Sequence, residues 1–257
     1  MSRMIRIDAA RRTQRPQGRS RRYRRAALAV GTPLLLTTVG CTAQPPDQPG
    51  AESAPVTADA VPLLEDLPEF GAVPPGTYVI SPIDAPASAP QAPVMSIPAG
   101  YSNIEGAGVS PGYLVDGAAG AVWLWDIQSV YTHPCDVGGY PEPVGPSVAD
   151  LAGALATQPM RDGTDPAPVT IGGYDGLYVE LSTPADLDFT TCRQGSFHSW
   201  PGRFQRDAGQ VDLLWIVDVD GQRITFDVSY PPSATPEQVA ELKEIVTTAT
   251  FVRREGA

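Results

Sequence analysis

The sequence predicts an α+β fold, an antiparallel β-sheet sandwich with two main helices. From residue 77 onward, short runs rich in Val, Ile, Tyr and Trp are separated by Gly, Pro and Asp, which is typical of antiparallel strands. Two later segments repeat apolar residues at helical spacing, one after Ser147 and one after Thr235. A chain of 257 residues with an N-terminal signal fits one domain of ordinary size.

The N-terminal forty residues have the parts of a secretory signal peptide. Residues 1–25 contain ten arginines and one acidic residue, Asp8, and residues 26–40 form an apolar core that leads to Cys41. A membrane-spanning helix needs about 20 apolar residues, and this core is shorter and is interrupted by a glycine and a proline. We therefore expect residues 1–40 to be a signal peptide, with an uncleaved anchor as the alternative.

The exit of this segment, Thr38-Val39-Gly40-Cys41, resembles the lipobox of bacterial lipoproteins. The resemblance implies a signal peptide of the lipoprotein type, with palmitate on Cys41 and Cys41 as the mature N-terminus. Val39 and Gly40 fit the pattern, whereas Thr38 stands where leucine is usual. The alternative is an ordinary secretory signal and a secreted protein.

The export route is left open by the basic segment. Ser20-Arg21-Arg22 is similar to a twin-arginine export signal. Arg24 and Arg25, however, occupy the positions where that signal has a Phe-Leu pair. The general secretory route and the twin-arginine route both remain possible.

Charge divides the chain sharply. The whole chain has a net charge of −11, but residues 1–25 hold ten of the 18 basic and one of the 29 acidic residues. Eight basic and 28 acidic residues remain after Cys41, a net charge of −20. So acidic a body argues against nucleic acid as a partner and against electrostatic docking on anionic lipid. We expect attachment to the cell membrane through the lipid on Cys41, on the extracytoplasmic face.

Once Cys41 is assigned to lipid, Cys135 and Cys192 form an even pair in an oxidising compartment. We expect a disulfide between them. A zinc site is the alternative, because His133 and His198 lie near the two cysteines in the sequence. The spacings do not follow the usual finger pattern, and we therefore expect no metal and no cofactor.

A proline-rich stretch follows the cysteine. Residues 42–60 have almost nothing bulky to bury, and 13 of the 28 prolines fall between positions 42 and 100. We expect residues 41–72 to be a disordered tether and residues 73–257 to be a single extracytoplasmic α+β domain.

The expected elements follow in order along this domain. Strands are predicted at residues 77–80, 94–97, 121–131, 169–171 and 177–181, the last two joined through Gly172-Gly173 and Asp175-Gly176. Ser147 and Asp150 have the capping-box spacing and begin a helix whose buried face is Val148, Leu151, Ala152 and Leu155. Residues 183–210 are expected to be irregular.

The runs on either side of Asp220-Gly221 predict a hairpin, because this is a favoured two-residue loop. If Val219 faces Gln222, the register puts three apolar pairs on one face: Val217–Ile224, Trp215–Phe226 and Leu213–Val228. On the other face Asp218 meets Arg223. A slip of one residue would scatter both sets.

The C-terminal part predicts a helix and a last strand. Thr235, Pro236 and Gln238 are an N-cap, a first-turn proline and a third-position Gln. The helix buries a stripe made of Val239, Leu242, Ile245 and Val246. Residues 249–252 return as a strand or extended tail.

The order of these elements carries a resemblance over roughly residues 76–254. A strand ending in Pro98-Ala-Gly-Tyr101, a middle helix, a late hairpin and a helix closing into Thr248-Ala-Thr-Phe251 resemble the PsbP/Mog1-like (LpqN/LpqT-type) domains of actinobacterial surface lipoproteins. Tyr101 stands where that family tends to have Trp, and the segment 183–210 is not part of the pattern. The resemblance implies a surface-exposed binding or adaptor module and supplies no catalytic residue.

Two motifs match the sequence patterns of a catalytic site and a metal site but are better explained as turns. Gly108-Val-Ser110-Pro-Gly112 matches a nucleophile elbow, but Pro111 lacks the N–H that the oxyanion hole needs. Asp218-Val-Asp220-Gly221 matches the start of a calcium loop whose other ligands are missing.

The four tryptophans are the candidates for ligand contact. Trp215 is expected in the core opposite Phe226, and Trp123 and Trp125 share one face of their strand. Trp200 lies in a polar stretch and is therefore the one weak ligand-binding candidate. A His-based catalyst could use only His133 or His198, each near a cysteine that we expect to be oxidised.

These observations predict a lipid-anchored extracytoplasmic binding or adaptor domain of the cell envelope, without catalysis. Its partner would be an envelope protein or a small ligand. A secreted hydrolase with an unrecognised active site and a structural envelope protein are the alternatives.

Overall fold

The computed structural model describes residues 61–86, 89–112, 120–136 and 140–254. The predicted signal peptide, the lipidation site Cys41 and most of the predicted tether lie outside the described residues. In the part of the chain that is described, neither helix has the length and apolar character to cross a membrane.

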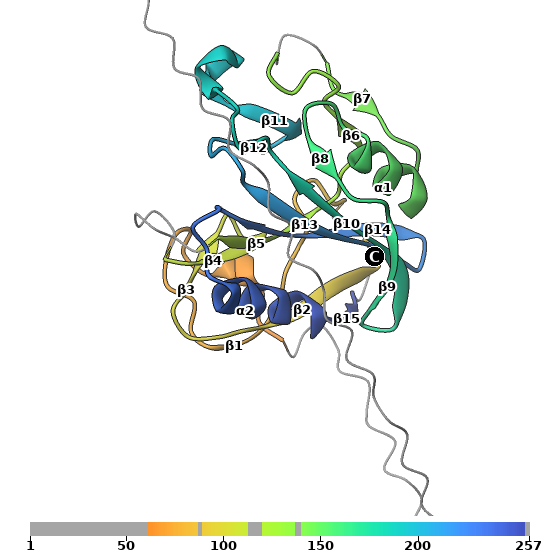
Figure 1. The fold of residues 1–257 in the computed structure, drawn as a ribbon. Helices are drawn as coiled ribbons and strands as arrows, with labels where there is room; N and C mark the ends of the chain where they lie inside the picture. Colours follow the sequence, from red (N-terminus) through yellow and green to blue (C-terminus); the bar gives the residue numbers. More distant parts are fainter. Residues whose placement is uncertain (1–60, 87–88, 113–119, 137–139, 255–257) are drawn as a thin grey trace, which may run out of the picture. The chain divides into compact units, whose positions relative to one another are not determined.

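The α+β class is confirmed, because two helices are combined with mostly antiparallel sheets (Figure 1). The large sheet has the strand order β3-β4-β5-β14-β13-β10-β8, and β9 also pairs with β10. Its strands are β3 (Tyr101–Ile104), β4 (Gly108–Pro111), β5 (Ala121–Trp125), β8 (Asp162–Gly163), β9 (Ala167–Ile171), β10 (Tyr174–Ser182), β13 (Val211–Val219) and β14 (Gln222–Tyr230).

Three smaller sheets accompany it. The three-stranded sheet has the order β1-β2-β15, with β1 (Gly76–Val79), β2 (Gln91–Ile97) and β15 (Thr250–Arg253). The two-stranded sheets are β6 (Ser129–Val130) with β7 (Glu142–Pro143), and β11 (Phe197–Trp200) with β12 (Arg203–Gln205). Short 3-10 turns lie at η2 (Leu64–Asp66), η3 (Phe189–Thr191) and η4 (Arg193–Gly195).

The predicted hairpin is confirmed, register included. Val219 pairs with Gln222, and the three apolar pairs and the Asp218–Arg223 pair follow in the expected order. Asp220 and Gly221 both have positive φ, 54° and 87°, as the two-residue loop requires. Trp215 is buried opposite Phe226, as predicted.

Both predicted helices are confirmed with their caps. In α1 (Val148–Ala156) the Ser147 hydroxyl accepts from Asp150 N, and the Asp150 carboxylate accepts from Ser147 N, a reciprocal capping box. In α2 (Pro236–Thr247) Thr235 and Gln238 form the same arrangement, with Pro236 at the first position.

Two apolar cores lie on opposite faces of the large sheet. The first is shared by the large sheet, the small sheet and α2, and includes Trp215, Phe226, Met95, Ile97 and Leu242. The second lies under α1 and the β11–β12 hairpin, and includes Leu151, Leu155, Leu214, Ile216, Trp125 and Trp200. The large sheet is therefore covered on both faces.

The predicted boundary between tether and domain, at residues 72 and 73, is wrong. Leu64 is fully buried in the first core, and Leu63 pairs with Val79 of β1. Ala72 pairs with Ser102 of β3. Residues 61–72 are therefore part of the folded domain, because their few apolar side chains cover the small sheet and the first core.

The predicted strand at residues 121–131 is broken into β5 and β6. Asp126 leaves the ladder with β14 because its N–H donates to the carbonyl of Ile83, from a segment about 40 residues earlier in the chain. Asp175-Gly176 lies inside β10 and not in the turn. A Cβ on Gly176 would lie 2.2 Å from the carbonyl oxygen of Ile216, so the glycine allows close approach of β13.

Residues 183–210 are not irregular throughout, which corrects another prediction. They contain η3, η4 and the β11–β12 hairpin. Likewise Gly108–Pro111 forms β4 and not a turn. Short strands with few β-branched residues gave no pattern in the sequence that separates them from loops.

Candidate functional site

The face of β14 that points away from the first core is polar but buried. Arg223, Thr225, Asp227 and Ser229 alternate with the apolar residues of the hairpin, and each is at most 7% exposed. Asp212 of β13 pairs with Ser229 and is also fully buried. Buried polar groups need partners, so this face requires polar side chains from the layer that covers it.

Two arginines from distant segments supply those partners. Arg161, which follows α1, donates through Nη2 to Asp212 Oδ2 at 2.6 Å. Arg203 of β12 also donates to Asp212, and its Nε lies 3.3 Å from Asp227 Oδ2. We refer to Arg161, Arg203, Asp212 and Asp227 as the ionic cluster.

The two carboxyl groups of the ionic cluster differ in pKa. Burial opposes ionisation of Asp212, but the charges of Arg203 and Arg161 outweigh it, so the pKa of Asp212 lies below its ordinary value. Burial and the neighbouring charge of Asp212 raise the pKa of Asp227 to about 7, against the attraction of Arg203. The ionic cluster therefore holds one carboxyl group that titrates near neutral pH.

Trp125 joins the ionic cluster to a cavity. Its indole Nε1 donates to Asp227 Oδ2 at 3.2 Å, and its ring forms part of the wall of a cavity of about 230 Å³. The rest of the wall comes from the turn after β5 (residues 126–129), from Trp200-Pro201 at the end of β11, and from Asp84. We refer to this space as the tryptophan cavity.

The aromatic wall is held firmly in place. The Trp125 ring stacks on Trp123, with centroids 5.6 Å apart, and meets the Trp200 ring edge-on at 5.7 Å. Trp125 and Trp200 are 3% and 1% exposed. The buried Nε1 of Trp200 has no hydrogen-bond partner among the described residues.

Backbone pairing brings two carboxylates to the same cavity. Ile83 N donates to Leu124 O at 2.9 Å, and Asp126 N donates to Ile83 O at 2.9 Å. The next residue, Asp84, then lines the cavity with Asp126. Asp84 has φ 66°, a left-handed backbone that costs a non-glycine residue energy.

Asp126 is the more buried of these two carboxylates. Burial raises the pKa of Asp126, although a hydrogen bond from Gln128 Nε2 and the charge of Arg223 act in the opposite direction. The guanidinium of Arg223 donates to three backbone carbonyls, those of Gly145, Ser147 and Ile127. It therefore lies near Asp126 without forming an ion pair with it.

The sequence-predicted candidate Trp200 lies in the wall of this cavity, but for a different reason from the one the sequence suggested. It does not stand in an irregular polar stretch; it ends β11 and packs in the second core. Its contact with a ligand stays a prediction.

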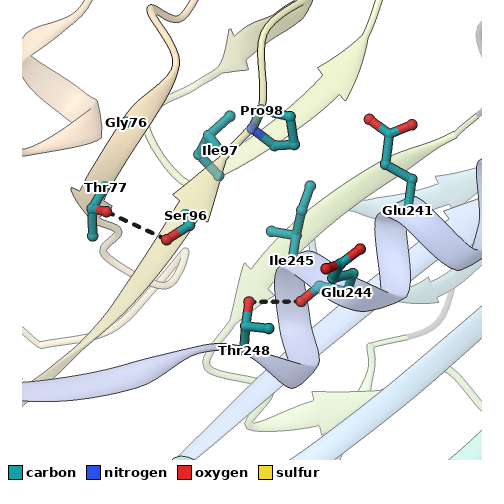
Figure 2. Close-up of a pocket in the computed structure, with 9 residues that line it drawn as sticks. All are labelled: Gly76, Thr77, Ser96, Ile97, Pro98, Glu241, Glu244, Ile245 and Thr248. Carbon is teal, nitrogen blue, oxygen red and sulfur yellow. Dashed lines mark hydrogen bonds between the residues drawn. The ribbon is translucent and has the colours of Figure 1, made fainter.

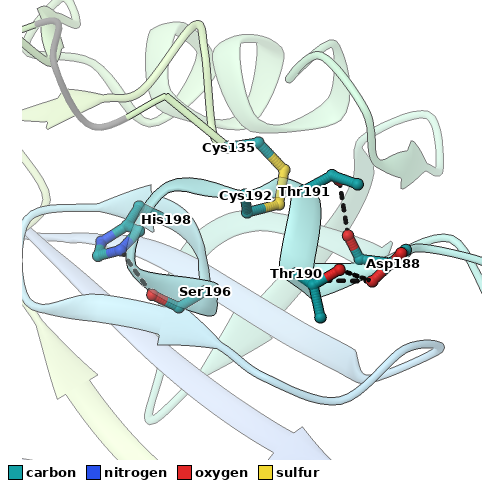
Figure 3. Close-up of a disulfide and its surroundings, with 7 residues drawn as sticks. All are labelled: Cys135, Asp188, Thr190, Thr191, Cys192, Ser196 and His198. Atoms are coloured by element: carbon teal, nitrogen blue, oxygen red, sulfur yellow. Dashed lines mark hydrogen bonds between the residues drawn. A yellow bond between two sulfur atoms is a disulfide. The ribbon is translucent and has the colours of Figure 1, made fainter.

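The predicted disulfide between Cys135 and Cys192 is present (Figure 3). Beside it, Arg193 N donates to Cys135 O at 2.7 Å, and His198 N donates to Pro134 O at 2.9 Å. The disulfide therefore fastens the chain after β6 to the β11–β12 hairpin, which supplies both Arg203 and Trp200.

The two histidines do not join the cysteines in one site. His133 is exposed, and His198 Nε2 lies 2.9 Å from the Ser196 hydroxyl (Figure 3). Ser196 is 3% exposed. Burial, and after it the charge of Arg206, lowers the pKa of His198. Within the described residues, no three His, Cys, Asp or Glu side chains are grouped closely enough to hold a metal ion.

The two turn-like motifs have structural roles. The Ser110 hydroxyl donates to Gly120 O at 2.6 Å within the large sheet. Asp218 Oδ1 accepts from Gly221 N at 2.6 Å, and Asp220 Oδ2 accepts from Gln91 Nε2 at 2.8 Å. Asp218 therefore stabilises the loop of the hairpin and is not bonded to Arg223.

A wider groove lies between α2 and the small sheet (Figure 2). Thr77 and Ser96 line one side with hydroxyl groups 3.3 Å apart, and Glu241 and Glu244 line the other. Its volume is about 470 Å³, and it opens more broadly to solvent than the tryptophan cavity. Glu241 already accepts a hydrogen bond from Tyr101 at 3.2 Å, so the groove is a weaker candidate.

Sequence reasoning missed Asp84, Asp126 and both arginines of the ionic cluster. No local pattern marks the two aspartates, because they meet through pairing over long sequence distance. The arginines did carry a signal. Only eight basic residues follow Cys41, and three of them, Arg161, Arg203 and Arg223, are each at most 8% exposed. Because basic residues are scarce in so acidic a domain, each arginine is a signal in the sequence for a specific partner.

No protein-family model matches the chain, and no curated protein matches it. Among solved structures, the chain is similar to LpqN, a protein involved in cell envelope biogenesis of Mycobacterium tuberculosis. The identity is 11%, the match covers 68% of this chain and 90% of that one, and the TM-score is 0.36. At that score the two folds are loosely similar.

Proposed function

We propose that this protein is a lipid-anchored extracytoplasmic binding domain of the cell envelope, which holds a small ligand in the tryptophan cavity. The observation that carries the proposal is the cavity itself. Ligand sites combine apolar or aromatic walls with a few fixed polar groups, and this wall has both. Ligand pockets for drug-sized molecules are roughly 300–1,000 Å³, so about 230 Å³ suits a smaller molecule.

The rest of the chain supports this location. A disulfide persists in an oxidising compartment, and the acidic body needs a separate means of membrane attachment, which a lipid on Cys41 would supply. The order of the elements also keeps the PsbP/Mog1-like surface lipoproteins as the proposed family, with the module acting by binding and not by catalysis.

Anchoring is tested by fractionation of cells that express the wild type or Cys41→Ala. We expect the wild type in the detergent phase and labelled by a palmitate analogue, and the variant released and unlabelled. A variant that stays membrane-bound with unchanged gel mobility would refute the anchor.

Binding is tested by thermal unfolding of the mature chain with a low-mass extract of the envelope. A ligand that binds only the folded state raises the unfolding midpoint by mass action. Ser129→Phe should abolish the rise, because Ser129 lines the cavity. Ser233→Phe is the control, because Ser233 is exposed and does not line the cavity, so this variant should keep the rise. A rise that survives Ser129→Phe would place the site elsewhere.

A secreted hydrolase is the second candidate, because Ser196 and His198 are within hydrogen-bond distance. A fluorophosphonate probe separates the two functions. Labelling that Ser196→Ala removes would favour the hydrolase. If neither labelling nor ligand binding occurs, a structural envelope protein becomes the better interpretation.

A further inference from the structure

Among the described residues, the tryptophan cavity is lined by negative charge and by no cationic side chain. Asp84 and Asp126 are its charged lining residues; the others are Trp125, Trp200, Pro201 and residues 127–129. A cavity that faces two carboxylates attracts a positive ligand and repels an anion.

Neither carboxylate is neutralised within the described residues. The ion pairs there lie within the ionic cluster, with one more between Arg193 and Asp136. The charge of Arg223 lowers the pKa of Asp126, but the Arg223 guanidinium donates its hydrogen bonds to backbone carbonyls. Half-buried Asp126 therefore keeps a charge that a bound cation would compensate.

The aromatic walls distinguish an organic cation from a metal ion. Indole rings attract ammonium groups through their electron-rich faces and also bury alkyl groups. A calcium ion would need six or more oxygen ligands, and the described residues hold no group of three candidate metal-binding side chains.

We propose that the tryptophan cavity binds a small alkylammonium ligand, with Asp126 and Asp84 as counter-charges and Trp125 and Trp200 as the aromatic wall. This inference rests on the proposed function, since it names the ligand class of the same site.

The test compares choline with its uncharged isostere, 3,3-dimethyl-1-butanol, and with ethanolamine. Each is titrated into the mature full-length chain, with tryptophan fluorescence and calorimetry as the readouts. We expect choline or ethanolamine to bind at least about tenfold more tightly than the isostere. Asp126→Asn should weaken the ammonium ligands about tenfold or more and leave the isostere unchanged.

Asp165→Asn is the matched control, because Asp165 is exposed and is not part of the cavity wall. Near-ultraviolet circular dichroism of Asp126→Asn checks that the tryptophans keep their packing. Equal binding of choline and the isostere, or no binding of either ammonium compound, would overturn the proposal. If neither choline nor ethanolamine binds the wild type while the envelope extract still produces a thermal shift that Ser129→Phe abolishes, the ligand class is overturned and the binding function stands.

Discussion

Asp227→Asn should remove a distinctive pH dependence from the stability of this protein. Asp227 is fully buried, and its pKa in the folded state is raised to about 7 from an ordinary value of 3.8. At a pH between these two pKa values, Asp227 has released its proton in the unfolded chain and still holds it in the folded chain. Stability therefore falls as pH rises through this window and levels off above it.

The magnitude follows from the two pKa values. They differ by about three pH units, and each unit corresponds to about 1.4 kcal/mol, so the effect of Asp227 is about 4 kcal/mol across the window. Asparagine cannot titrate, yet its side-chain oxygen can still accept from Trp125 Nε1. The variant should lack this slope, whatever its stability at any one pH.

Urea unfolding of both proteins at pH 5, 6, 7 and 8 measures the slope. The pKa of Asp212 is lowered, so Asp212 contributes its stability above its ordinary pKa and loses it only as pH falls below that value, outside this window. Asp126 and His198 titrate in both proteins, so they cancel in the difference. Parallel stability curves for wild type and Asp227→Asn would refute the reasoning.

Two further predictions concern the parts that close the second core. Replacing both Cys135 and Cys192 by alanine should lower the free energy of unfolding by roughly 4 kcal/mol, because the disulfide closes a loop of 57 residues; urea unfolding measures this, and reduced wild type should match the variant. Arg203→Met should cost about 3–5 kcal/mol in the same assay, because it removes one of the two guanidinium groups that pair with the buried, ionised carboxylate of Asp212. Exposed Arg206→Met is the control, and equal losses for the two would contradict the role of the ionic cluster.

Local chemistry made a large part of the fold predictable. The hairpin register followed from a two-residue loop and strict alternation, and both helices followed from capping residues and apolar spacing. In each case the determining residues lie within about one turn of the element they define. The disulfide was predictable for a different reason, the parity of three cysteines once Cys41 was assigned to lipid.

The candidate site was not predictable, because its parts meet only in three dimensions. In the sequence, Asp126 is simply one residue of an alternating strand. In the structure, the hydrogen bond from Asp126 N to Ile83 O takes the chain out of that strand. Asp84 reaches the same cavity through that bond. Trp200 was selected for its polar neighbours, and those neighbours line the buried face of a hairpin whose strands are too short to show a period.

The polar face of β14 explains why these separate features belong together. Polar and apolar residues alternate along β14, which is typical of a sheet with one face in water. Here, however, Asp227 of β14 and Asp212 of the neighbouring β13 are fully buried. Burying two carboxylates requires cations from the covering layer, and Arg203 arrives on the hairpin that the disulfide fastens. The first strand of that hairpin ends in Trp200, whose ring contacts Trp125, and Trp125 also donates a hydrogen bond to Asp227. The interactions that close the second core thus also build the wall of the tryptophan cavity, so a variant that loosens the hairpin should weaken ligand binding and stability together.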